Sequence, residues 1–308
     1  MELKIIVEDM FLNLAPENID GPMGRKTVLG LANDYEDGDW RYASFQDFIW
    51  DNVAETALSA QEREKLVNRS QSTLRAAARN LRLTDATNDI SKGSELAEII
   101  LYGVLKHHYG ALPVVPKIFY KQNAQDNAKG ADSVHIVVDA KNDFSLWFGE
   151  AKFYNSIDDA RLASVVSSVG EALKTEKLKK ENSIVTNVRD IDGLGLDEGL
   201  RNRIRAALSN KSSIDELKPR IHIPILLLYE CKITAEAKMY NEQYVSEVKS
   251  YHINRAASYF LKQAKDLSKL IHLYEQITFH LILIPVPNKK SIVDKFIEHA
   301  SHYKNGGK

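Results

Sequence analysis

The 308-residue chain carries 41 basic and 42 acidic residues, so no overall positive charge marks it as a nucleic-acid-binding protein. Hydrophobic residues make up 44% and charged residues 27%, which is ordinary globular usage and excludes a fibrous or disordered class. The single cysteine, Cys231, excludes an intramolecular disulfide, and the longest apolar run, residues 223–229, is too short to cross a bilayer. Because no basic-then-apolar leader opens the sequence, we expect a cytoplasmic protein with no membrane partner.

The first part of the chain predicts a short strand followed by helices. Residues 3–7 indicate the strand, and proline and glycine residues then interrupt the pattern as far as Gly38. Ser44 is placed to cap a helix with regularly spaced apolar residues. A second helix is expected over residues 61–81 and carries four arginines on a mostly polar face: Arg69, Arg75, Arg79 and Arg82. A solvated face explains these arginines, and a phosphate-contacting strip is the alternative.

The middle of the chain predicts a longer helix and then a β-hairpin. Apolar side chains recur at helical spacing over residues 92–109. Two apolar runs, residues 134–138 and 144–148, flank five turn-forming residues and indicate antiparallel strands. Further helices are expected over residues 158–180, 197–209 and 244–271, and buried strands over residues 223–229 and 277–284. Strands interleaved with helices, together with one antiparallel pair, predict an α/β fold with a mixed central sheet flanked by helices.

The hairpin is expected to bring three chemically distinctive side chains together. Glu150 and Lys152 are two residues apart, so in an extended strand they point to the same face of the sheet. If the turn is symmetric about Lys141, Asp132 lies directly opposite Glu150, where opposed Cβ atoms are roughly 5 Å apart. Two carboxylates so close repel each other unless a cation lies between them, and oxygen ligands favour Mg²⁺ or Mn²⁺.

Such a constellation is suited to phosphodiester hydrolysis. A bound metal would polarise the phosphate and activate a water molecule, and Lys152 would position that water or stabilise the developing negative charge. The upstream helix adds Glu95 and Glu98, one turn apart, of which Glu98 is the favoured helical ligand. The predicted catalytic residues are therefore Asp132, Glu150, Lys152 and Glu98, and the three acids among them are the predicted metal ligands.

The order of a helical glutamate, then Asp132, then Glu150-x-Lys152 resembles the motif of the PD-(D/E)xK nucleases, which have a restriction-endonuclease-like fold. Residues 93–153 are similar to the HamA family, the nuclease subunit of the Hachiman anti-phage defence system. The segments that carry this similarity are Glu95-Leu-Ala-Glu98, Lys129-Gly-Ala-Asp132 followed by His135, and Gly149-Glu-Ala-Lys-Phe153. One position departs from the motif, because Ala131 stands where the motif has proline.

The resemblance implies an Mg²⁺-dependent DNA nuclease effector of bacterial defence, whose activity is controlled by a superfamily-2 helicase partner, HamB-like. From the length of the chain we expect one catalytic domain with an N-terminal extension, namely an extension over residues 1–90 and a nuclease domain over residues 91–308. No G-x-x-x-x-G-K-[ST] loop occurs, so the chain itself is not expected to hydrolyse ATP. A stand-alone restriction or repair endonuclease of the same fold, or a non-catalytic nucleic-acid-binding subunit, are the alternative functions.

Other interpretations of the same residues stay open. The Glu-x-Lys spacing recurs at Glu230 and at Glu236, although no hairpin is expected to return an acid to Glu230. Glu150 and Lys152 could form a surface ion pair worth at most about 1 kcal/mol. His135 is expected either in the core with its hydrogen bonds satisfied or beside the acids. A basic cluster at the expected end of the 158–180 helix suits a solvated terminus or a nucleic-acid contact, and comprises Lys174, Lys177, Lys179 and Lys180.

Overall fold

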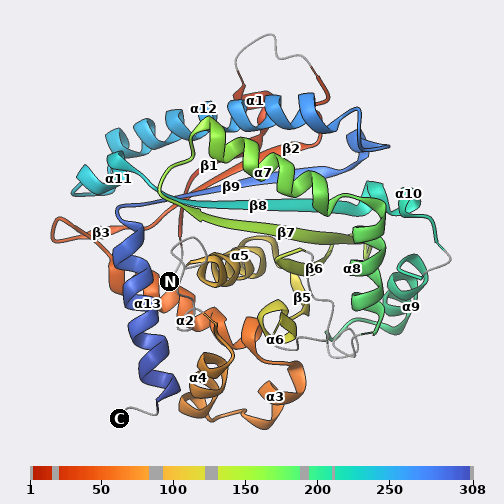
Figure 1. The fold of residues 1–308 in the computed structure, drawn as a ribbon, viewed down its shortest axis with the longest axis horizontal. Coiled ribbons are helices and arrows are strands. Elements are labelled where there is room, and N and C mark those ends of the chain that lie inside the picture. The colour runs from red at the N-terminus through yellow and green to blue at the C-terminus, as the bar shows by residue number, and fades with distance from the viewer. Residues whose placement is uncertain are drawn as a thin grey trace.

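A mixed sheet forms the centre of the molecule (Figure 1). The structure is a computed structural model that describes residues 3–15, 21–82, 93–121, 131–187, 194–209 and 212–305. Within these ranges seven strands form the sheet. In spatial order they are β1 (Lys4–Met10), β2 (Lys26–Ala32), β9 (Thr278–Val286), β8 (Ile221–Glu230), β7 (Phe144–Tyr154), β6 (Ser133–Val138) and β5 (Leu112–Val115).

The four central strands, β2, β9, β8 and β7, are parallel, whereas β1, β6 and β5 add antiparallel edges. A parallel strand with helices over both faces is buried on both sides, so its sequence shows no alternation of polar and apolar residues. Residues 223–229 of β8 are continuously apolar for this reason. The predicted α/β class with a mixed central sheet flanked by helices is confirmed.

Helices cover both faces of the sheet (Figure 1). On one face lie α1 (Phe11–Leu14), α7 (Asp159–Ala172) and α12 (Glu242–Leu267), with α8 (Thr175–Asn187), α9 (Glu198–Ala207) and α10 (Ile214–Leu217) at one end. On the other face lie α2 (Tyr42–Ala57), α5 (Ser94–Tyr109) and α13 (Lys289–Lys304), beside α3 (Ala60–Lys65), α4 (Ser70–Arg79) and α6 (Lys117–Lys121). The connections also include α11 (Lys232–Glu236), the 3-10 helices η3 (Lys218–Arg220) and η4 (Tyr274–Gln276), and the small ribbon of β3 (Tyr35–Glu36) and β4 (Asp39–Trp40).

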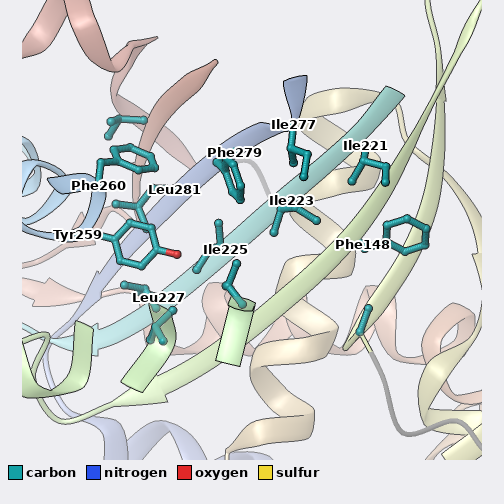
Figure 2. Packing of buried hydrophobic residues seen from close by; sticks show 14 of the residues in the cluster. Phe148, Ile221, Ile223, Ile225, Leu227, Tyr259, Phe260, Ile277, Phe279 and Leu281 are labelled. Atoms are coloured by element: carbon teal, nitrogen blue, oxygen red, sulfur yellow. The ribbon is translucent and has the colours of Figure 1, made fainter. Parts of the chain in front are cut away.

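Each face of the sheet has its own apolar core. Figure 2 shows the first core, where alternate residues of β8, such as Ile223 and Ile225, pack with Phe279 of β9 and Tyr259 of α12. The intervening residues, such as Leu226, face α5 and α13 in the second core. Odd and even positions of one strand therefore belong to different layers, and this parity decides which side chains can meet at the site.

Several predicted boundaries are wrong. The helix expected over residues 158–180 is two helices, α7 and α8, and the one over residues 61–81 is also two, separated near Asn68, which has a φ of 61°. Ser44 lies inside α2 and does not cap it, since α2 begins at Tyr42. Strand β2 and helix α13 were not predicted. Among the described helices, none combines the length and apolar character that a bilayer crossing requires.

The N-terminal strands belong to the main sheet, because β2 pairs directly with β9. The expected division of the chain near residue 90 falls outside the described residues and stays a prediction. Lys129, part of one segment that carries the family resemblance, also lies outside them.

Candidate active site

The hairpin of β6 and β7 carries the predicted site. Its register pairs Ser133 with Gly149, and the N–H of Asp132 donates to the Gly149 carbonyl at 2.8 Å. Asp132 therefore lies opposite Glu150, as the symmetry of the turn predicts. The turn closes through Asn142, whose positive φ of 58° is a conformation that asparagine tolerates better than most residues.

Two carboxylates converge on one ammonium group. The Lys152 Nζ lies 2.5 Å from the Glu150 Oε1 and 3.8 Å from the Asp132 Oδ2. The backbone N–H of Ala151 also donates to the Asp132 Oδ2, at 3.1 Å, and fixes that side chain against β7. Glu150 is only 7% exposed, so its charge requires partners of this kind. The structure thus brings Asp132, Glu150 and Lys152 together.

The charge of Lys152 is set by two opposing effects. Burial lowers the pKa of its ammonium, but the nearby Asp132 and Glu150 carboxylates outweigh burial and raise the pKa above its ordinary value. Lys152 is therefore a cation at neutral pH. A side chain in this state can stabilise an anion or orient a water molecule, but it cannot accept a proton.

Sequence reasoning did not find Ser168, which also contacts the site. Its Oγ donates to the Glu150 Oε1 at 2.5 Å. Ser168 belongs to α7, which packs on the sheet face toward which Glu150 points. A serine on a helix that also has a buried apolar stripe carries no distinctive signal, so the contact could not be read from the sequence.

A cleft of about 240 Å³ opens beside Glu150. Apolar side chains, among them Phe148 and Ile223, line part of it, and β7, α7 and α8 form its walls. Its polar side chains include Glu150, Ser168 and Glu181, with Lys177 on the α8 side. The cleft gives a ligand access to one of the two converging carboxylates.

The helical glutamates occupy different positions from the hairpin acids. Glu98 is buried on α5, which packs on the sheet face opposite α7. Glu95 accepts a hydrogen bond from the backbone N–H of Arg82 at 2.8 Å. In the described ranges no three His, Cys, Asp or Glu side chains are arranged to hold a metal ion. The structure therefore brings two predicted carboxylates and the lysine together, and does not add Glu98 as a third member of a preformed acidic cluster.

The competing Glu-x-Lys at Glu230 has another environment. The Glu230 Oε1 accepts the backbone N–H of Lys289 at 2.7 Å, and its Oε2 accepts the side-chain amide of Asn155 at 2.8 Å. Both strands beside β8 are parallel to it, so no hairpin returns an acid to Glu230, as expected. Glu230 therefore stabilises the start of α13 by accepting the N–H of its first residue.

The buried position expected for His135 is confirmed, but its ring nitrogens are not satisfied as expected. Neither nitrogen has a hydrogen-bond partner among the described residues. The ring packs against Tyr102 at 4.8 Å, and burial lowers the pKa of His135 to about 3. Its cross-strand partner Trp147 belongs to the α5 core, so His135 lies on the sheet face away from Glu150.

The basic cluster lies at the junction of α7 and α8, because α7 already ends at Ala172. Lys177, Lys179 and Lys180 belong to the first two turns of α8, where the helix dipole disfavours positive charge. The expected position at the end of one long helix is therefore wrong, although Lys174, Lys177 and Lys179 are exposed to solvent, and a contact to nucleic acid stays a prediction. The arginines of α4 are exposed, which fits either interpretation of them.

The comparisons with known proteins give one family and no curated relative. The HamA family model matches residues 9–300 of the 308 and so spans Glu98, Asp132, Glu150 and Lys152. No curated protein matches the chain. The match extends the resemblance found in residues 93–153 to nearly the whole sequence. The chain belongs to the HamA family, and so to the proteins of the Hachiman anti-phage defence system.

Proposed function

We propose that this HamA protein is a metal-dependent deoxyribonuclease whose site is built from Asp132, Glu150 and Lys152. The observation that carries the proposal is the convergence of two opposed carboxylates on one ammonium group beside an open cleft. The hairpin register places two acids opposite each other and a lysine on the same face. This arrangement suits the binding of a metal ion and a phosphate group better than the stabilisation of a strand.

The donor set fits Mg²⁺ or Mn²⁺. Asp132 and Glu150 supply hard oxygen atoms, and they already face a common positive charge in the form of the Lys152 ammonium. Two carboxylates suffice for Mg²⁺, which usually retains several water molecules and binds substrate phosphate oxygens besides. When bound, the ion would polarise the scissile phosphate and lower the pKa of a water ligand. Glu98 as a further ligand stays a prediction.

The three side chains have separate tasks in this proposal. Asp132 and Glu150 bind the cation, and Ser168 holds the Glu150 carboxylate by donating to it. Lys152 keeps its positive charge and stabilises the extra negative charge that develops on the phosphate during attack. A divalent ion between the carboxylates would weaken their hold on Lys152 and leave its ammonium available to the substrate.

DNA is the proposed substrate, and a superfamily-2 helicase is the proposed partner that controls cleavage. The family supports both, since HamA belongs to a multi-protein defence system. A net charge of −1 supports a division of labour in which the partner provides much of the grip on DNA. A non-catalytic nucleic-acid-binding subunit is the second candidate, favoured by the lack of a three-ligand acidic cluster in the described residues.

Cleavage of plasmid and linear DNA in Mg²⁺ tests the proposal, with the chain alone and with its helicase partner. Glu150→Gln and Lys152→Ala should each lower the cleavage rate by roughly 100-fold or more, because each removes a charge aimed at the reacting phosphate. The matched control is Glu230→Gln, at the competing Glu-x-Lys, which should cleave like the wild type.

Activity that survives both changes would exclude the site. Calorimetry with Mn²⁺ separates the two candidate functions, because only the nuclease requires binding that Asp132→Asn abolishes. A folded wild-type protein that takes up no Mn²⁺ would favour the non-catalytic subunit.

A further inference from the structure

A buried ion pair adjoins the cleft beside Glu150. The Lys117 Nζ lies 2.7 Å from the Glu181 Oε2, and the two side chains are only 3% and 4% exposed. The other oxygen, Glu181 Oε1, accepts the backbone N–H of Ala131 at 3.0 Å. Glu181, on α8, thus joins the first residue of α6 to the residue that precedes Asp132.

Asp132 needs such an anchor because of its position in the hairpin. The strand β6 begins at Ser133, so Asp132 lies just beyond the regular ladder. Its backbone is held on one side by the Gly149 carbonyl, and its side chain by the N–H of Ala151. Both of these contacts come from β7, and neither fixes the chain that enters from residue 131.

A buried ion pair is an expensive way to gain stability. Two charges lose their hydration, and an apolar pair of similar size is often as stable or more stable. Such pairs are retained in some proteins because they specify one geometry. In this protein the ion pair fixes the backbone of Ala131 through the N–H of that residue. The proline that the PD-(D/E)xK motif has at this position would carry no N–H.

We propose that Glu181 is a positioning residue that holds Asp132 opposite Glu150, with Lys117 as its counter-charge. The inference rests on the proposed function, since it gives Glu181 a role in metal binding through Asp132. The carboxylate compensates for the missing proline: where a proline would restrict the backbone by its ring, this chain fixes it by a hydrogen bond to the Ala131 N–H. Glu181 also lines the cleft beside Glu150, so its hold on the backbone acts at the edge of the site.

A matched pair of double variants isolates the hydrogen bond from the ion pair. Glu181→Gln with Lys117→Met removes both charges but keeps an oxygen that can accept the Ala131 N–H. Glu181→Leu with Lys117→Met removes both charges and the acceptor as well. Neither double variant buries an unpaired charge, so both are expected to fold, and near-ultraviolet circular dichroism checks that they do.

Metal affinity and amide exchange are the two measurements. The leucine variant should bind Mn²⁺ more weakly than the glutamine variant, by ~10- to 100-fold, which is the usual effect of losing a group that orients a metal ligand. Its KM for DNA at saturating Mn²⁺ should stay within about twofold, because the buried Glu181 carboxylate is already bonded to Lys117 and the Ala131 N–H. Hydrogen exchange at the Asp132 amide should be at least tenfold faster in the leucine variant than in the glutamine variant.

Equal Mn²⁺ affinity and equal Asp132 exchange in the two variants would overturn the inference. The exchange measurement requires no bound metal, so it stands even if the wild type neither binds Mn²⁺ nor cleaves DNA. A wild type that neither binds Mn²⁺ nor cleaves DNA would reject the proposed nuclease. The exchange measurement would still test whether Glu181 holds Asp132 in place. If the wild type is active and the variants differ in neither measurement, the nuclease stands and the role of Glu181 falls.

Discussion

The pKa values of two lysines of this chain are shifted in opposite directions, although burial lowers both. Lys152 lies beside two carboxylates, which raise its pKa despite burial. Lys26 is only 2% exposed and has aromatic rings around it, with Tyr274 at 4.5 Å and Phe279 at 5.0 Å. Its ammonium donates to the Pro22 carbonyl at 2.9 Å, but burial dominates and lowers the pKa of Lys26 to about 7.

Lys26 should therefore make stability depend on pH in the alkaline range. Between pH 7 and about 10 the unfolded chain binds a proton at Lys26 that the folded chain has lost, so the free energy of unfolding rises with pH, by up to ~1.4 kcal/mol per unit. Lys26→Met should remove this slope and be more stable than the wild type at pH 7. Urea unfolding at pH 7, 8 and 9 measures both effects. Lys249→Met, at an exposed site, is the control, and parallel profiles for wild type and Lys26→Met would contradict the prediction.

The central part of the candidate site was predictable because its three residues belong to one hairpin and lie close together in the sequence. Strand parity places Glu150 and Lys152 on one face, and the symmetry of one turn places Asp132 opposite Glu150. Ser168 and Glu181 were not predictable, since they come from helices that reach the hairpin only through packing of the whole α7 layer. Local periodicity indicates which face of a helix is buried, but not which strand residue that face will meet.

At the scale of elements, the start of α13 depends on two side chains. Asn288 caps the helix by accepting the N–H of Ser291 at 2.8 Å. Glu230, from the end of β8, accepts the N–H of Lys289 at 2.7 Å. The first N–H groups of a helix have no partner within it, so each of these contacts stabilises the helix.

Glu230→Ala should consequently lower the free energy of unfolding by about 1–2 kcal/mol, the usual range for a lost cap. DNA cleavage below the unfolding transition should not change, because Glu230 takes no part in the proposed site. Urea unfolding measures the loss, and Glu236→Ala, an exposed glutamate in the other spare Glu-x-Lys, is the matched control. A rate loss as large as that of Glu150→Gln would instead make Glu230 part of the active site.

Strand β2, helix α13 and the break between α7 and α8 were not predicted, for different reasons. In β2, Gly30 interrupts the strand pattern, yet it is needed there because an added Cβ would lie 2.4 Å from the His252 Nδ1. Helix α13 gave a readable signal, with Asn288 as cap and apolar residues at Ile292, Phe296 and Ala300, so it could have been predicted. The break between α7 and α8 has no proline or glycine to mark it, so the helical pattern of the sequence continues across it.

At the scale of the whole molecule, three buried histidines and the half-buried His222 are neutral in the folded state at pH 7. Burial lowers the pKa values of His135, His252 and His280 to about 3 and that of His222 to about 4. Three of them lie with Trp147 on the α5 face of the sheet, where the His222 and His280 rings stack on Trp147 and share a hydrogen bond of 2.8 Å.

Acid should therefore destabilise the protein well above the pKa values of its folded histidines. As pH falls from about 6.5 toward 4, the unfolded chain takes up protons that the folded chain excludes, so the free energy of unfolding falls, by up to ~1.4 kcal/mol per pH unit for each histidine. His135→Phe removes one of these titrating groups, so it should lower the slope of the unfolding free energy against pH by up to ~1.4 kcal/mol per pH unit. Urea unfolding between pH 7 and 4.5 provides the measurement, with exposed His302→Gln as control. A stability that does not change across this interval would refute the prediction.

The class of fold followed from the sequence, but the order of strands did not. Alternating strand and helix patterns indicate an α/β protein wherever they occur. Strand order depends on contacts between distant segments, as when residues 26–30 pair with residues 279–283. Nothing in either segment specifies the other, so the expected N-terminal extension could not be seen as part of the main sheet.

Strand β9 lies between β2 and β8, although it is the last strand to leave the ribosome. Until residues 278–286 have been made, β2 has no strand on its open edge, and β8 has one only on the β7 side. A chain that ends before Thr278 still contains the β6–β7 hairpin with the proposed acids, but it lacks the strand that hydrogen-bonds to both β2 and β8. Addition of β9 is therefore the step that completes the ladder across the seven described strands.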